Sequence, residues 1–310
     1  MSLLELSEVL SHRCHDSERT LHLIEAVLQS VEASPPAASL REMVLRALFT
    51  HADDDDDAVL VALARVLLTL RVTGTHLANA CKIVFKIAKN DKNDHYFRNT
   101  NLLELVVEGM GRAEPLADST SCVFGCAALR VLALEPGLAA RAVRAGATHL
   151  AALHLKILNN HKAENPRSSS EQCTHALYQV TGALRSLASV VDAHAQEFVA
   201  SAALPELINA LHLHTDRDVL TNVARCLSVL SGCPRCCACL CSCSAAARAL
   251  LRALAACAAR APLAVRLAYT LGNMAADDER ARNDIYNEEG SIDVLLTILE
   301  SYTKRSTHGS

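Results

Sequence analysis

The segment "ALRSLAS" (183–189) decides the fold, because four other stretches of the chain repeat its pattern. The other copies are "IVFKIAK" (83–89), "ALRVLAL" (128–134), "CLSVLSG" (226–232) and "TLGNMAA" (270–276). Each copy has two apolar residues three positions apart, and a small residue follows in most of them. The first apolar residues of the five copies are Val84, Leu129, Leu184, Leu227 and Leu271. They are 45, 55, 43 and 44 positions apart. A period of this length indicates a repeat architecture.

One interval is longer than the rest, and a polar insertion accounts for it. The stretch "NNHKAENPRSSSEQ" (159–172) carries Pro166 and three serines, which is typical of a surface loop. Without about ten of its residues the repeat period is restored. We therefore predict an inserted loop near 159–172.

A turn-forming or small residue follows the second apolar anchor of every copy. These residues are Asn101, Gly146, Ser201, Ser244 and Gly290, and an apolar helical run follows each of them. Each repeat should therefore consist of a long helix, a short helix, a turn and a further helix. One such unit cannot bury its apolar face alone, whereas stacked neighbours share a continuous core.

These observations predict an all-α fold, an α-solenoid wound as a right-handed superhelix. Residues 76–304 should form about five repeats, and residues 1–75 should form N-terminal helices that act partly as an atypical capping repeat. Residues 305–310 read as a polar tail. The acidic run at 53–57 is either a binding face or, as we favour, a solvated turn that caps the next helix, because carboxylates stabilise helix N-termini.

Composition agrees with a helical protein and limits its partners. Hydrophobic residues make up 51% of the chain, aromatic residues only 3%, and Trp is absent, so Ala and Leu must fill the core. A net charge of −4 argues against non-specific nucleic-acid binding. We find neither a secretory signal nor an uncharged apolar run long enough to span a membrane. We therefore expect a cytoplasmic protein without membrane or nucleic-acid partners.

Three segments, "VTGALRSLA", "LAYTLGNMA" and "GSIDVLLTILE", resemble armadillo repeats. HEAT repeats share the period, but they usually have two helices per unit, and they remain the alternative. The stretches at 70–94, 179–188, 216–232 and 290–302, in this order, resemble one ciliary and flagellar family of armadillo-repeat proteins. The resemblance implies a scaffold or adaptor that binds proteins and serves axoneme assembly in cilia and flagella, the sperm flagellum included. A signalling or adhesion scaffold of the β-catenin type is a further alternative.

In armadillo proteins the third helices line a groove, where peptide-binding members repeat an Asn with a Trp one turn earlier. Only Tyr269 with Asn273 keeps an aromatic–Asn pair here, which argues against the nuclear-import mode of binding. The third helices instead carry seven basic residues: Lys82, Lys86, Lys89, Arg130, Arg185, Arg225 and Arg266. These nine residues are our predicted groove, and an acidic segment of an axonemal or ciliary transport protein is its expected partner. The alternative is that the basic side chains only extend into solvent.

The stretch "SGCPRCCACLCSC" (231–243) holds six of the thirteen cysteines. The repeat places it on the short helix after Pro234, where a thiol can pack as a small apolar side chain. A structural zinc needs four converging ligands, and Cys233-x-x-Cys236 supplies only one regular pair. We favour packing of reduced thiols, with a metal or redox site as the alternative on Cys233, Cys236, Cys239, Cys241 and Cys243. No catalytic or nucleotide-binding motif occurs, so we expect neither an enzyme nor a cofactor.

Overall fold

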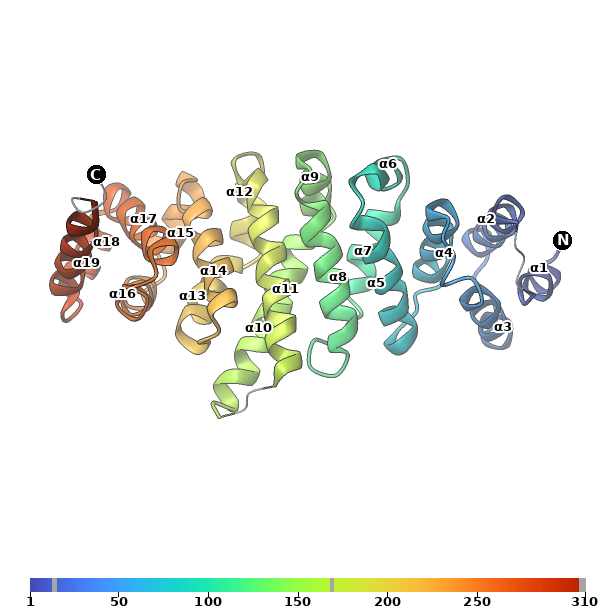
Figure 1. The fold of residues 1–310 in the computed structure, drawn as a ribbon, viewed down its shortest axis with the longest axis horizontal. Coiled ribbons are helices and arrows are strands. Elements are labelled where there is room, and N and C mark those ends of the chain that lie inside the picture. The colour runs from blue at the N-terminus through green and yellow to red at the C-terminus, as the bar shows by residue number, and fades with distance from the viewer. Residues whose placement is uncertain (13–15, 168–169, 307–310) are drawn as a thin grey trace. The chain divides into compact units, whose positions relative to one another are not determined.

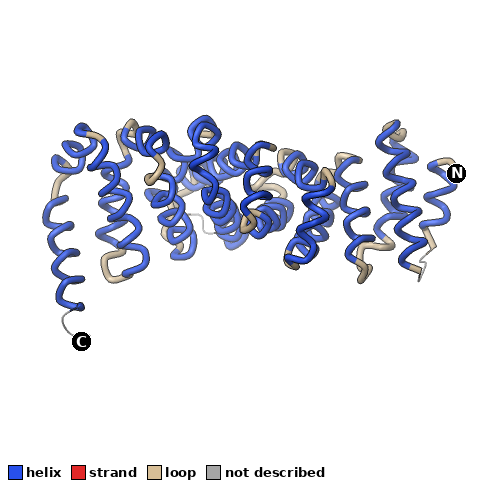
Figure 2. The backbone as a smooth tube through the Cα atoms, turned by 90° about the horizontal axis from the view of Figure 1, so that it is seen from above, coloured by secondary structure: helices blue, strands red, loops and turns tan. Residues whose placement is uncertain are grey.

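The computed structural model describes residues 1–12, 16–167 and 170–306. In this part of the chain it contains nineteen α-helices and two 3₁₀ turns but no strand (Figures 1 and 2). The all-α prediction is therefore confirmed. The chain forms two compact units, Met1–Ala147 and Thr148–Ser310.

The first unit holds the helices up to α9. They are α1 (Leu3–Leu10), α2 (Ser17–Ala33), α3 (Ala38–Phe49), α4 (Asp57–Thr69), α5 (Gly74–Ala88), α6 (Asp94–Asn99), α7 (Leu102–Met110), α8 (Ser119–Leu132) and α9 (Pro136–Arg144), with the 3₁₀ turn η1 (Asp91–Asn93). Helix α2 packs on α4, α4 on α5, and α5 on α8 (Figure 1). Val84 and Leu129, the repeat anchors in this unit, are buried.

The second unit holds the remaining helices. They are α10 (Ala147–Glu164, whose first residue belongs to the first unit), α11 (Glu171–Leu187), α12 (Val191–Ala200), α13 (Ala203–Leu213), α14 (Arg217–Leu230), α15 (Pro234–Cys241), α16 (Ala246–Ala256), α17 (Ala261–Asp277), α18 (Glu279–Asn287) and α19 (Ser291–Ser306), with the 3₁₀ turn η2 (Ala188–Val190). Helices α11, α14 and α17 lie side by side in this order (Figure 1). Leu184, Leu227 and Leu271, the other repeat anchors, are buried.

The predicted order of helices within a repeat is confirmed. Every long anchor helix (α5, α8, α11, α14 and α17) is followed by a short helix (α6, α9, α12, α15 or α18) and then by a further helix (α7, α10, α13, α16 or α19). The two apolar positions of the pattern face inward because they lie about one turn apart on the same side of each long helix. The long helices therefore supply both the shared core and an outer face.

A residue with a left-handed backbone precedes the last helix in the repeats that end with α10, α13 and α19, whereas Asn101 before α7 and Ala245 before α16 both have a φ of −88°. Gly146 before α10 has a φ of 95°, and Gly290 before α19 has a φ of 73°. Glycine adopts this conformation without steric cost. In the repeat that follows Leu187 the left-handed residue is Ala202, with a φ of 58°, directly after the predicted turn residue Ser201, which lies between α12 and α13. This repeat contains the turn η2, and its spacing is one residue longer than that before Gly146.

Two predicted surface segments can now be placed. The Asp56 carboxylate caps α4 by accepting a hydrogen bond of 2.8 Å from the amide of Ala58, so the acidic run does cap this helix. The inserted segment is shorter than the predicted 159–172, because α10 continues to Glu164 and α11 begins at Glu171. Residues 165–170 join the two helices.

No single helix in the described residues is long and apolar enough to cross a membrane. Helices α14 and α15 meet the length and composition requirement only as a pair, and this pair is bent by 116°.

Candidate partner-binding face

Lys82 and Lys86 lie on the exposed side of α5 in the first unit, and the exposed Lys89 directly follows this helix. The ammonium group of Lys82 lies 5.7 Å from the ring centroid of Phe124, and that of Lys89 lies 5.6 Å from the ring centroid of Phe85. The two aromatic rings are themselves 5.9 Å apart. Cation–π attraction therefore holds two of the charges over an aromatic base, from which they still face solvent.

The other two basic residues of this unit are more closely tied to the protein. The Lys86 ammonium donates a hydrogen bond of 2.9 Å to the main-chain oxygen of Asp54, in the acidic turn before α4. Arg130 is half-buried on α8. Lys86 thus links α5 to the preceding turn as well as presenting charge.

In the second unit, Arg185 serves an internal contact. Its Nη1 donates to the Oδ1 of Asn222 at 3.1 Å. Asn222 is buried on α14, and its Nδ2 donates to the main-chain oxygen of Tyr178 at 3.2 Å. The half-buried Arg185 therefore helps to join α11 and α14, which reduces its availability to a partner.

Asn273 is committed in a similar way. Its Nδ2 donates to the Oγ of Ser231 at 3.0 Å, which ties α17 to the end of α14. Tyr269, one turn earlier on α17, is 54% exposed. The aromatic–Asn pair from the sequence is present on one helix, but only its aromatic member is free of a neighbouring repeat.

Five exposed side chains on α14 and α17 form what we call the α14–α17 face: Arg225, Val229, Val265, Arg266 and Tyr269. Val229 is 41% exposed and Val265 is 56% exposed. Sequence reasoning missed both valines as binding residues. Their spacing of four from Arg225 and Tyr269 was the available signal, since it places each valine on the same side of its helix as an exposed predicted residue.

The two arginines of the α14–α17 face carry uncompensated charge. In the described part of the chain, neither Arg225 nor Arg266 forms an ion pair. Exposed apolar groups beside unpaired charges can bind a segment of opposite charge that also presents apolar side chains.

The cysteine-rich stretch forms the short helix α15, as the repeat predicts. Cys233, Cys236, Cys237 and Cys241 are buried, and Cys239 and Cys243 are half-buried. Burial, followed by the neighbouring thiol of Cys233, raises the pKa of Cys236 to about 12. Burial also raises the pKa of Cys237 to about 12. Burial therefore disfavours the thiolate form of both residues.

Two thiols of this stretch contact main-chain oxygens of neighbouring helices. The Sγ of Cys236 donates to the oxygen of Ala195 at 3.9 Å, and that of Cys241 donates to the oxygen of Met274 at 3.8 Å. Among the residues that the structure describes, no three sulfur atoms of this stretch lie within 4.8 Å of one another. The geometry therefore favours packing over a four-ligand metal site.

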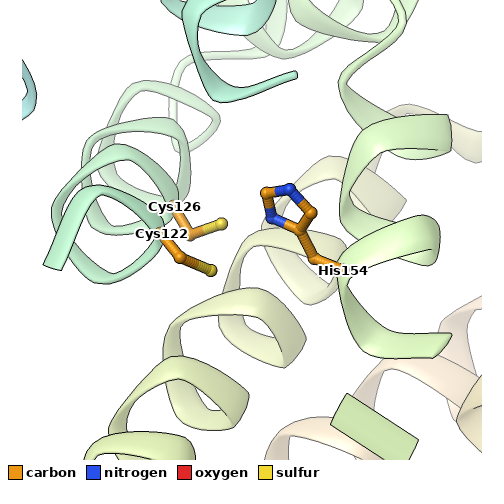
Figure 3. Close-up of side chains that lie close together, drawn as sticks. All are labelled: Cys122, Cys126 and His154. Atoms are coloured by element: carbon orange, nitrogen blue, oxygen red, sulfur yellow. The ribbon is translucent and has the colours of Figure 1, made fainter. Parts of the chain in front are cut away.

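A further thiol pair lies on α8, and the sequence analysis overlooked it. Cys122 and Cys126 are both buried and one turn apart (Figure 3). The hydrogen bond from the Cys122 thiol, and then burial, hold the pKa of Cys126 well above its usual range. Spacing of four on an anchor helix could have revealed this pair.

Comparison with known proteins identifies the lineage. Armadillo repeat-containing protein 2 from mouse (Mus musculus) is 33% identical over 266 residues, which cover 84% of this chain and 31% of the relative. The cattle (Bos taurus) and human (Homo sapiens) proteins of the same name are 31% and 30% identical over 273 and 275 residues. This chain is homologous to armadillo repeat-containing protein 2. No model of a known protein family matches it.

Homology to armadillo repeat-containing protein 2 decides between the two repeat types, since the alternative was the HEAT repeat. The chain spans about a third of the length of these relatives, at 31% of each. Solved structures similar to it include the designed armadillo repeat protein YIII(Dq)4CqI, with 15% identity, a TM-score of 0.48, and coverage of 88% of this chain and 100% of that one. The designed protein YIII(Dq.V1)4CPAF, in complex with the peptide (KR)4, has 15% identity, a TM-score of 0.46 and the same coverage.

Proposed function

We propose that this chain is a non-catalytic adaptor that binds an acidic protein segment on its α14–α17 face. One observation carries the proposal: Arg225 and Arg266 are exposed and unpaired beside three exposed apolar side chains on adjacent helices. The apolar groups provide burial for the partner's side chains, and the arginines select carboxylates. This face is narrower than the nine-residue groove predicted from the sequence.

The expected binding energies show which groups of the α14–α17 face must act together. An exposed ion pair contributes at most about 1 kcal/mol, so two arginines together supply up to about tenfold to thirtyfold in affinity. Burial of a valine or tyrosine surface contributes about 25 cal/mol per Å². Binding should therefore depend on both kinds of group, and it should weaken as salt screens the charges.

We further propose that the partner belongs to the axoneme of cilia and flagella, including the sperm flagellum. Homology to armadillo repeat-containing protein 2 supports this role, because the resemblance of the sequence is to a ciliary and flagellar family. In this proposal the protein acts in the cytoplasm and at the cilium as an adaptor for axonemal components.

Proximity labelling in ciliated cells tests the proposal. The double variant Arg225→Glu with Arg266→Glu should lose labelling of axonemal proteins while its thermal stability stays unchanged, since both side chains are exposed. The matched control reverses Arg217 and Arg280, which are also exposed in the second unit, and should label like the wild type. Equal labelling by the two double variants would refute binding at this face, and a wild type that labels no axonemal protein would refute the ciliary role.

A further inference from the structure

A pocket of about 290 Å³ lies in the second unit, away from the five residues of the α14–α17 face. The end of α13, the first turn of α14 and the last turns of α16 form it. Leu211, Leu220 and Cys257 are buried and provide apolar lining. We call it the edge pocket. Its volume is just below the range of sites for drug-sized ligands, so one or two side chains fill it better than a cofactor would.

Positive charge gathers at the opening of the edge pocket. Arg252 on α16 and Arg260 just before α17 are both exposed lining residues. In the described residues neither guanidinium has an ion-pair partner, and no lining residue is acidic. An apolar floor under two unpaired guanidinium groups suits a ligand with an apolar group next to a carboxylate.

The buried histidine of the pocket does not change this charge balance. His214 is buried, and its lowered pKa of about 4, caused by burial and then by Lys162, leaves it neutral at physiological pH. His212 is an exposed lining residue. The floor is therefore uncharged, and Arg252 and Arg260 carry the fixed charge.

A second pocket adjoins the first and distinguishes a peptide from a small molecule. It has a volume of about 230 Å³, and it shares His214 and Thr215 with the edge pocket. Its lining residues include Leu158, Lys162 and Asp216, and the Lys162 ammonium donates a hydrogen bond of 2.8 Å to the main-chain oxygen of Pro166. Two pockets with a common wall match side chains two residues apart in an extended chain, because these point to the same side.

We infer that the edge pocket is a second docking site, which binds an acidic protein segment by taking an apolar side chain between Arg252 and Arg260. The apolar side chain two residues further along the segment then lies in the adjoining pocket, beside Leu158 and Leu177. This site is independent of the α14–α17 face, so an adaptor of this kind holds a partner, or two partners, at two places.

Fluorescence anisotropy with a labelled octapeptide of alternating glutamate and leucine tests the site on the full chain. Exchanging leucine for serine in the peptide removes the apolar group, and exchanging glutamate for lysine inverts the charge. We expect the glutamate–leucine peptide alone to bind. The double variant Arg252→Gln with Arg260→Gln should weaken it about tenfold, which corresponds to two exposed ion pairs.

A matched pair of alanine variants separates filling of the pocket from general effects. Ala253 lines the edge pocket, whereas Ala255 is exposed on the same helix and does not line it. Ala253→Leu should therefore weaken peptide binding, while Ala255→Leu and the charge control Arg280→Gln should leave it unchanged.

Three results would overturn the inference. Equal weakening by Arg280→Gln would mean non-specific attraction between charges. Weakening by Arg225→Gln with Arg266→Gln, but not by Ala253→Leu, would place the peptide on the α14–α17 face and leave the proposed function intact. A concentration-dependent dimer in sedimentation equilibrium that Ala253→Leu abolishes would assign the edge pocket to a second copy of the chain.

Discussion

Acid should destabilise the second unit through one buried histidine. His214 is only 9% exposed, and its Nε2 lies 2.9 Å from the Oδ1 of Asn159. The Nδ2 of Asn159 donates to the main-chain oxygen and the Oε2 of Glu206, at 3.0 and 2.9 Å. Because the amide oxygen of Asn159 must then accept, the Nε2 of His214 carries the hydrogen. This network joins α10 to α13.

The sign of the pH effect follows from the lowered pKa. Burial, and then repulsion by Lys162, lowers the pKa of His214 to about 4, whereas an unfolded histidine titrates near about 6.5. Between these values the unfolded chain binds a proton that the folded chain excludes. The contribution of neutral His214 is thus fully present above the unfolded pKa and is lost as the pH falls toward 4. From pH 7 to pH 5 the loss amounts to about 2 kcal/mol.

The substitution His214→Gln isolates this effect, because Gln keeps an N–H donor for Asn159 but does not titrate. Urea unfolding at pH 7 and pH 5 should show a loss for the wild type that exceeds the loss for the variant by about 2 kcal/mol. Hydrogen exchange of the amides of α13 and α14 should report the same difference, with α5 of the first unit as the internal reference. Parallel losses in the wild type and the variant would refute the reasoning.

Two further predictions concern packing. Gly125→Ala on α8 should destabilise the first unit by about 1–3 kcal/mol, because the added Cβ would lie 1.8 Å from the Sδ of Met110. Gly272→Ala on α17 should instead stabilise the second unit by about 0.5–1 kcal/mol, because nothing lies within 4 Å of its added Cβ. Thermal unfolding of the two variants measures both changes. A third prediction concerns the cysteines: purified protein should contain no stoichiometric zinc by elemental analysis. Replacing Cys239, Cys241 and Cys243 by Ala should cost only modest stability. One zinc per chain that is lost with these substitutions would contradict this prediction.

The repeat was readable from the sequence because its cause is local. Two apolar residues three positions apart must share one side of a helix, so Leu184 and Leu227 identify buried positions without knowledge of their neighbours. The position of α15 followed from the same register, since Pro234 begins the helix. The repeat period was thus sufficient to predict which residues are buried and in which order the helices occur.

The hydrogen-bond partners of individual side chains could not be predicted from the repeat pattern. Arg185 and Asn273 occupy predicted groove positions, yet each bonds to a residue of a neighbouring repeat. Arg185 bonds to Asn222, 37 positions later, and Asn273 bonds to Ser231, 42 positions earlier. The predicted loop began too early because Asn159, although polar, is a buried residue of α10 that bonds to Glu206 of α13. Such contacts depend on how neighbouring repeats are placed, which the local pattern does not encode.

Ala202 has a consequence for how such a chain changes over evolutionary time. A left-handed alanine costs roughly 1 kcal/mol, and yet the turn before α13 keeps the conformation that Gly146 and Gly290 adopt before their helices. This turn therefore does not require a glycine. A lineage can therefore lose its signature residues one repeat at a time, each loss absorbed by intact neighbours. Drift of this kind erases the sequence marks of a repeat family long before it alters the architecture.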